Sequence, residues 1–483
     1  MFNSALTKVL KTFSKQEIKE FGLFIKSPFF NTNQSVVRLY EQIKMLHPDF
    51  DEKLSGKKLL FEKAFGKIDF NDSFMTMTVF RLMELAKQFL VFANLQRNDL
   101  FNGTILLDEL NHRELDNLLV KSISDLDKKI KKEKANDAET YYAKYKLEYY
   151  KNDIKSRDTK MITYKDILDK ELILEQKYMN TNFFINSLIF FQYFLNQKNF
   201  VVNTEGYPDF INEILGYIDQ NPDYLNEPEL NLYYKLVKLL ITNDDKYFFE
   251  MYKKLFEDKD DLKINSKHNL IAVLRNYAQR KVQEGQREYV EKAFEILKFS
   301  LEKDITTYSP SSKYMTETRF MNIVWTGLSL KKLDFTEEFI NKYINKIEPE
   351  KRQYVFAYNA AKLEFERNNF SLALQKLSES GQVKNVMYKA AIKQLQLMIY
   401  FELKYFIPAG ELLDSYRHFT KTDKLLPEIY KSQCNTFINY YDRLLKIAVS
   451  TDKKSIDLEK LITELKLTPL NWLLKKAIEQ SKS

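Results

Sequence analysis

Residues 359–374 read Asn-Ala-Ala-Lys-Leu-Glu-Phe-Glu-Arg-Asn-Asn-Phe-Ser-Leu-Ala-Leu, and this stretch decides the fold class. It joins a helical pattern to a polar turn at Asn368-Asn369, and the aromatic Phe370 follows that turn. A second helical pattern restarts within three residues of the aromatic. The stretch therefore predicts two helices connected by a short turn, with no strand between them.

Similar turns recur through the second half of the chain. Each has a polar turn, an aromatic residue and a helix restart: Asp245-Lys246-Tyr247, Arg287-Glu288-Tyr289, Leu333-Asp334-Phe335, Asn368-Asn369-Phe370 and Lys404-Tyr405-Phe406. The aromatic residues are 42, 46, 35 and 36 residues apart, and the last two intervals approach the constant period of stacked helix pairs. Because one pair is too small to bury its own apolar face, neighbouring pairs must cover one another.

Glycine and proline are scarce over the whole chain. There are ten of each among 483 residues, where average usage would give roughly 34 and 24. Sheets, hairpins and long loops depend on these residues, because glycine supplies positive φ and proline fixes a bend. With no convincing run of period-two alternation either, we expect an all-α protein.

The first 100 residues predict a separate helical domain. Ser14-Lys15-Gln16-Glu17 has the spacing of a capping box, and Pro28 should stop the helix that follows it. We expect further helices over residues 34–46 and 55–65 and from 72 onward. Asn98 to Thr104 is the expected domain boundary, and residues 202–228, with three prolines, form the most loop-like segment.

The repeating part resembles the tetratricopeptide repeat family. Ala361 matches the small residue of that family's first helix, Asn368-Asn369-Phe370 matches its turn, and Ala373 matches the small residue of its second helix. Phe406 and Ala409 repeat the turn and second-helix matches. The resemblance is strongest over residues 320–420 and weaker over 240–320.

The chain also departs from that family's pattern. The turn glycine is absent from the two best turns, and Leu397 is bulky where a small residue is expected. Glu338 stands in place of the alanine that should follow Phe335. The N-terminal part, with its Ser-Pro-Phe-Phe-Asn turn, resembles uncharacterised bacterial helical proteins, a likeness that implies no function.

The resemblance implies a right-handed helical-repeat solenoid whose first helices line a concave groove. The implied organisation is an N-terminal helical domain over 1–100, irregular helical repeats over 101–240 and repeats of this family's type over 241–483. The groove positions would be Tyr358, Lys362, Phe365 and Glu366 in one repeat and Gln394, Met398, Phe401 and Glu402 in the next. Phe365 and Phe401 fit packing against a neighbouring helix equally well.

We therefore expect the partner-binding residues to be Tyr358, Lys362, Glu366, Gln394, Met398 and Glu402. Polar groups at such positions can bind the backbone of a peptide or a partner helix.

The sequence does not indicate a catalytic or metal site. The four histidines, His47, His112, His268 and His418, lie far apart without the spacing of a metal site. No cluster of glycines could hold a phosphate. Cys434 lies in a helical pattern and fits a small buried side chain better than a nucleophile. We expect no enzymatic activity, no cofactor and no metal.

The net charge of +8 is a mild excess over this length. The densest basic run, Lys128 to Lys134, fits either a solvated helix end or a contact with a polyanion. A single cysteine and the absence of a leader pattern predict a cytoplasmic protein. The uncharged stretch Tyr178 to Gln197 contains several Asn and Gln residues, which favour a buried helix over a membrane span.

These observations predict a non-enzymatic scaffold or adaptor that binds a protein or peptide. Two other functions stay open. One is a signal- or peptide-responsive regulator with the N-terminal domain as output module, although the 34–46 helix carries only Arg38 and Lys44 as basic residues. The other is a nucleic-acid- or ribosome-associated factor that uses the basic run.

Overall fold

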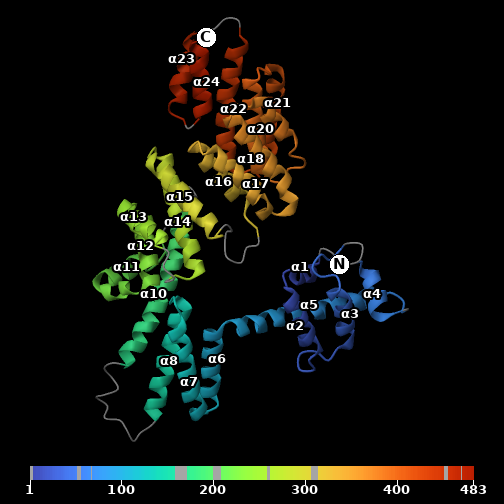
Figure 1. The fold of residues 1–483 in the computed structure, drawn as a ribbon, viewed down its shortest axis with the longest axis vertical. Helices are drawn as coiled ribbons and strands as arrows, with labels where there is room; N and C mark the ends of the chain where they lie inside the picture. The colour runs from blue at the N-terminus through green and yellow to red at the C-terminus, as the bar shows by residue number, and fades with distance from the viewer. Residues whose placement is uncertain are drawn as a thin grey trace. The chain divides into compact units, whose positions relative to one another are not determined.

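The computed structural model describes residues 4–51, 56–66, 68–157, 171–198, 208–257, 262–305, 314–450, 455–468 and 470–482. Within these ranges all regular secondary structure is helical and no strand occurs, which confirms the all-α prediction (Figure 1). The chain divides into two compact units. The first contains Met1–Ser187 and Asn221–Leu230, and the second contains Leu188–Gln220 and Asn231–Ser483.

The helices follow one another along the chain. In the first half of the chain they are α1 (Ala5–Leu10), α2 (Lys15–Lys26), α3 (Gln34–Lys44), α4 (Lys57–Phe65), α5 (Asp72–Arg97), α6 (Asp99–His112), α7 (Asp116–Lys132), α8 (Ala138–Arg157) and α10 (Glu171–Lys198). They continue with α11 (Ile211–Gln220), the 3-10 helix η1 (Pro222–Asn226), α12 (Pro228–Thr242), α13 (Asp245–Phe256), α14 (Ile264–Gln283) and α15 (Glu288–Glu302).

The remaining helices belong to the second unit. They are α16 (Glu317–Ser329), α17 (Leu333–Tyr343), η2 (Ile344–Lys346), η3 (Pro349–Lys351), α18 (Arg352–Glu366), α19 (Phe370–Ser378), α20 (Val386–Glu402), α21 (Phe406–Thr422), α22 (Glu428–Val449), α23 (Ser455–Leu465) and α24 (Asn471–Lys482).

The N-terminal helices α1 to α5 bury a common core. The predicted capping box is present, since the Glu17 amide donates to Ser14 Oγ and the Ser14 amide donates to the Glu17 carboxylate. The helix ends before Pro28, as expected. Phe21 and Tyr40 pack edge to face, with ring centroids 5.1 Å apart, and both are fully buried.

Two expected loops contain helices. The segment expected as a boundary, residues 98–104, is the start of α6, and the Asn98 side chain caps that helix by accepting from the Phe101 amide. Gly103 lies inside α6 where a Cβ would come within 2.8 Å of Leu126 on α7. In the loop-like segment 202–228, residues before 208 lie outside the described ranges, and α11 and η1 occupy most of the rest.

One turn geometry ends α14, α16, α18 and α20. The last turn of each helix is closed by a backbone N–H that donates to a carbonyl five residues earlier, for example Asn369 to Glu364 at 2.9 Å and Tyr405 to Tyr400 at 2.8 Å. The residue before each donor has left-handed backbone. These residues are Gly285, Lys331, Asn368 and Lys404, with φ of 92°, 58°, 63° and 59°. This is the Schellman motif, which satisfies carbonyls at a helix end.

The left-handed residues correct the repeat register. Counted from Lys331, Leu333 begins α17 as Phe370 begins α19 and Phe406 begins α21. Phe335, which the sequence pattern places at the turn, therefore lies two residues inside α17 and is not equivalent to Phe370 or Phe406. The residue three positions after each helix start is Thr336, Ala373 or Ala409, and all three are fully buried. The comparison that placed Glu338 at the small-residue position was wrong.

The helices from α14 onward pack in an alternating order. We call α14, α16, α18, α20 and α22 the first helices and α15, α17, α19, α21 and α23 the second helices. Each first helix contacts the second helix that follows it. From α16 onward the first helices also contact one another in sequence, α16 with α18, α18 with α20 and α20 with α22, and α24 packs against α22 (Figure 1).

Gly327 on α16 allows α17 to approach closely, and its substitution tests this packing. A Cβ at Gly327 would come within 2.3 Å of Thr336 Oγ1. We expect Gly327→Ala to lower the free energy of unfolding by about 1–3 kcal/mol, because the two helices must separate. Gly216 on α11 is the matched control, since a Cβ there meets nothing within 4 Å. Gly216→Ala should be neutral or stabilise by up to about 1 kcal/mol in chemical denaturation. Equal effects would contradict the close approach.

The left-handed lysine of the α20 turn gives a prediction of opposite sign. Lys404 is exposed and has a φ of 59°, where a Cβ clashes with the backbone. Lys404→Gly should raise the free energy of unfolding by about 1 kcal/mol, because glycine carries no such penalty. The control is Glu411→Gly at an exposed position inside α21, which should cost about 1 kcal/mol. A loss of stability with Lys404→Gly would contradict the turn assignment.

Candidate functional site

The predicted residues on α18 lie together on one face of that helix. Lys362 Nζ forms an ion pair with Glu366 Oε1 at 3.1 Å and lies 5.0 Å from the centroid of the Phe365 ring. Tyr358 packs edge to face on Tyr388 with ring centroids 5.4 Å apart, and burial raises the pKa of Tyr358 to about 12. Lys362 and Glu366 are partly exposed, so the charged end of this face can reach solvent.

The predicted residues on α20 differ strongly in exposure. Gln394 is partly exposed, and no side-chain hydrogen bond joins it to another described residue. Met398 and Phe401 are buried in the core formed by α18 to α24. Glu402 is nearly buried, with 12% of its side chain exposed.

Helix α24 covers the end of α20 and α18. Trp472 Nε1 donates to Glu402 Oε1 at 2.8 Å, and Lys476 Nζ lies 2.7 Å from Glu402 Oε2. The Trp472 ring lies 5.6 Å from Phe401 and 6.5 Å from Phe365, centroid to centroid. Phe365, Phe401 and Glu402 therefore contact α24 of the same chain. The two phenylalanines pack against a neighbouring helix, which was one of the two roles that the sequence left open for them.

The Glu402–Lys476 pair is a buried electrostatic contact. Only 11% of the Lys476 side chain is exposed. Burial alone would lower the pKa of Lys476, but hydrogen bonds from its ammonium to the Glu402 and Glu479 carboxylates raise that pKa above its ordinary value. The pair thus keeps Lys476 charged, and it fastens α24 to the first helices.

The corrected register identifies equivalent positions in the earlier pairs. Tyr358 and Lys362 lie ten and six residues before the left-handed Asn368, and Gln394 and Met398 lie at the same distances before Lys404. Counted back from Gly285, these positions are Arg275 and Gln279 on α14; counted back from Lys331, they are Met321 and Trp325 on α16. We call these eight residues the first-helix face.

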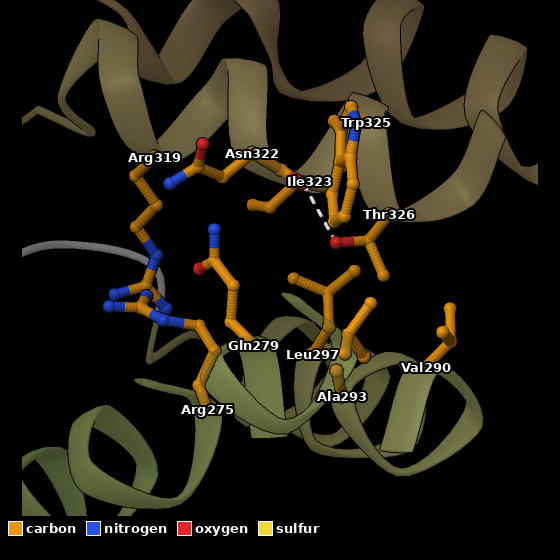
Figure 2. Close-up of a pocket in the computed structure, with 11 residues that line it drawn as sticks. Arg275, Gln279, Val290, Ala293, Leu297, Arg319, Asn322, Ile323, Trp325 and Thr326 are labelled. Carbon is orange, nitrogen blue, oxygen red and sulfur yellow. Dashed lines mark hydrogen bonds between the residues drawn. The ribbon is translucent and has the colours of Figure 1, made fainter. Parts of the chain in front are cut away.

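Three residues of that face line a pocket between α14, α15 and α16 (Figure 2). Arg275 and Gln279 come from α14 and Trp325 from α16. The full lining is Arg275, Gln279, Val282, Val290, Ala293, Leu297, Arg319, Asn322, Ile323, Trp325 and Thr326. The wall on the α15 side is apolar, and Trp325 is 44% exposed beside it.

The polar end of the pocket is cationic. The guanidinium groups of Arg275 and Arg319 converge there (Figure 2). Burial, together with the charge of Arg275, lowers the pKa of Arg319 to about 9. Burial also lowers the pKa of Arg275. The charge of Arg319 also acts on His268 of α14: burial and this charge both lower the pKa of His268.

This pocket was not predicted from the sequence, because groove positions were assigned only within residues 358–366 and 394–402 and none on α14 or α16. The left-handed residues would have placed Arg275 and Gln279 on the same face as Tyr358 and Lys362. Arg319 gave no sequence signal, because it projects from a neighbouring position of α16.

The basic run, Cys434 and the possible metal ligands were the other candidate features of the sequence. In the basic run, Lys128 pairs with Asp125 at 3.1 Å and Lys129 with Asp99 at 2.8 Å. Cys434 is buried, and burial raises the pKa of its thiol. Within the described ranges, no group of three or more His, Cys, Asp or Glu side chains is arranged to hold a metal ion.

Glu402 gives a prediction that separates a structural role from partner binding. Glu402→Gln should lower the free energy of unfolding by about 2 kcal/mol, because it removes one partner of a buried charge. Glu366→Gln is the matched control in an exposed ion pair and should change stability by less than about 0.5 kcal/mol. Chemical denaturation measures both. If the two variants were equally stable, the network with α24 would not be a stabilising contact.

No protein-family model, curated protein or solved structure matches the chain. Among the helices of the described ranges, none has the length and apolar character that crossing a membrane requires.

Proposed function

We propose that the chain is a non-enzymatic scaffold or adaptor that binds a protein or peptide along the first-helix face. In this proposal the helix pairs form a right-handed solenoid that resembles tetratricopeptide repeats, and the protein acts in the cytoplasm. The observation that carries the proposal is the equivalence of the face positions in four successive pairs. Arg275, Gln279, Trp325, Lys362 and Gln394 share one register, and all remain at least partly exposed.

The composition of the face also supports binding. A surface needed only for packing would carry buried apolar residues at these positions, as Met398 does. Instead four of the eight face positions carry polar or charged groups, namely Arg275, Gln279, Lys362 and Gln394, and Trp325 adds an exposed aromatic ring. Such a mixture is typical of protein interfaces. Trp and Arg are the residues most often found to dominate binding energy.

The two ends of the face differ in their availability. At the C-terminal end, α24 already occupies Phe365, Phe401 and Glu402. From α14 to α18 the partly exposed positions Gln279, Trp325 and Lys362 remain. We therefore place the partner on the α14 to α18 part of the face and assign Glu402 to the fastening of α24.

The alternatives receive no comparable support. On α3, Lys44 and the neighbouring Lys26 both pair with Glu41, so a basic recognition surface is not favoured there. Ion pairs of Lys128, Lys129 and Lys131 neutralise much of the basic run on α7. A nucleic-acid function would require binding to RNA that weakens steeply with salt.

Site-specific photo-crosslinking tests the proposed face. A benzophenone amino acid introduced at Gln279 or Gln394 should capture the same partner in the cells that express the protein, because both positions lie on the face. The matched controls are Glu338 on α17 and Glu411 on α21, which are exposed on second helices. Mass spectrometry of the crosslinked bands should identify a common protein from the face positions alone. Equal capture from both sets, or RNA in place of protein, would contradict the proposal.

A further inference from the structure

The turn between α2 and α3 presents a group of exposed apolar side chains on the first unit. Phe29 in this turn is 88% exposed, and Leu23 in the last turn of α2 is 72% exposed. The Phe30 ring stacks on Phe24 at 3.9 Å and lies 6.2 Å from the exposed Phe92 of α5, centroid to centroid. Single exposed apolar residues are common on proteins, but a group of them marks a contact surface. We call Leu23, Phe29, Phe30 and Phe92 the apolar patch.

Internal hydrogen bonds hold the turn that carries this patch. The backbone amides of Phe30 and Asn31 donate to the Ser27 carbonyl oxygen at 3.1 and 3.0 Å. The Asn31 side-chain amide donates to the Ile25 and Asn33 carbonyl oxygens at 2.9 and 3.2 Å, and the Asn33 amide donates to Asn31 Oδ1 at 3.0 Å. The turn is therefore fixed, and these polar groups need no water as a partner.

The two segments that form the patch are uncharged and end at basic residues. No charged residue occurs between Lys26 and Arg38, which enclose the turn, or between Lys87 and Arg97 on α5. Over residues 15–44 the chain carries five Lys or Arg residues and three Glu residues. The surroundings of the patch therefore favour an anionic contact over a cationic one.

Lys19 and Arg38 supply charge that is available outside the molecule. Both are exposed, and neither forms an ion pair with a carboxylate of the described ranges, whereas Lys26 pairs with Glu41 at 2.8 Å. The basic residues that enclose the α5 segment are paired as well. Lys19 lies one helical turn before Leu23 and therefore on the same side of α2.

We propose that the apolar patch attaches the protein to the surface of an anionic lipid bilayer. The rings of Phe29 and Phe30 enter the boundary between headgroups and acyl chains, which removes their apolar area from water. Lys19 and Arg38 stay at the headgroups, where the negative lipid charge attracts them. Because the turn satisfies its own polar groups, it can approach the apolar layer at little cost.

A second copy of the chain fits this patch less well. Around a two-fold axis, the same patch of both copies would meet, and Lys19 and Arg38 of one copy would approach those of the other. Like charges across an interface oppose association. The same charges favour a bilayer that contains acidic lipids.

Co-sedimentation of the full chain with lipid vesicles tests the proposal. The protein should bind phosphatidylcholine vesicles that contain about one third phosphatidylglycerol at least about tenfold more tightly than vesicles of phosphatidylcholine alone. Raising the NaCl concentration from about 50 to about 500 mM should reduce this preference, because salt screens the lipid charge. Equal binding to both kinds of vesicle, or binding to neither, would overturn the proposal.

The variant Phe29→Ser separates insertion of the patch from attraction by charge alone. It should weaken binding to the anionic vesicles at least about fivefold, and its melting temperature should equal that of the wild-type protein because the ring is exposed. Ile407→Ser is the matched control, since Ile407 on α21 is similarly exposed outside the patch, and it should bind like the wild-type protein. Equal binding of Phe29→Ser and the wild-type protein would overturn the proposal.

The variant Phe29→Trp gives a spectroscopic readout of insertion. It should bind at least as tightly as the wild-type protein, because tryptophan favours the membrane interface. Its emission should shift to shorter wavelength with anionic vesicles, beyond any change from Trp325 and Trp472 in the wild-type protein. An unchanged emission in the bound state would contradict insertion.

Photo-crosslinking in cells distinguishes a bilayer from a protein as the occupant. A benzophenone amino acid introduced at Phe29 should crosslink to lipid. Capture of protein alone would overturn the proposal and assign the patch to a protein partner. The vesicle tests do not involve the first-helix face, so their failure would leave the proposed partner binding untouched.

Discussion

The Schellman turn that ends α14, α16, α18 and α20 is the constraint on which the packing of these helix pairs depends. A left-handed residue closes the turn, and the following second helix begins two residues later, after Lys331, Asn368 and Lys404 alike. This fixed offset places Thr336, Ala373 and Ala409 at the same buried point against their first helices. The spacing of the pairs therefore follows from backbone hydrogen bonding, and the chain tolerates lysine or asparagine at positions where glycine would cost less.

The same constraint sets which side chains share a face. Because α14, α16, α18 and α20 end in one geometry, positions counted back from the left-handed residue point in equivalent directions. The face therefore changes character along the chain without any change of backbone. Arg275 and Gln279 give a cationic, pocketed end, Lys362 and Glu366 give a balanced ion pair, and Met398 joins the core. Binding chemistry can vary from pair to pair while the packing stays the same.

Local signals in the sequence predicted local structure. The capping box at Ser14 and Glu17, the stop before Pro28 and the turn at Asn368-Asn369 all depend on residues within one or two helical turns. Phe335 misled the register because an aromatic residue inside α17 resembles the one that begins α19. Trp472 could not be placed in advance, because its hydrogen bond to Glu402 spans 70 residues and depends on how α20 and α24 pack together. The convergence of Arg275 with Arg319 is likewise a contact between helices that pattern analysis does not register.

The charged clusters at Glu402 and at Arg275 with Arg319 lie at opposite ends of the first-helix face and differ in their contacts. At Glu402 a buried carboxylate is satisfied within the molecule by Trp472 and Lys476, so that end is closed and serves stability. At the α14 to α16 end, Arg275 and Arg319 converge in a pocket with the apolar residues Val290 and Leu297 (Figure 2). Trp325, which also lines this pocket, is 44% exposed. The first-helix face is therefore covered by α24 at one end and reaches solvent at the other, and for this reason we propose that a partner binds the α14 to α18 part.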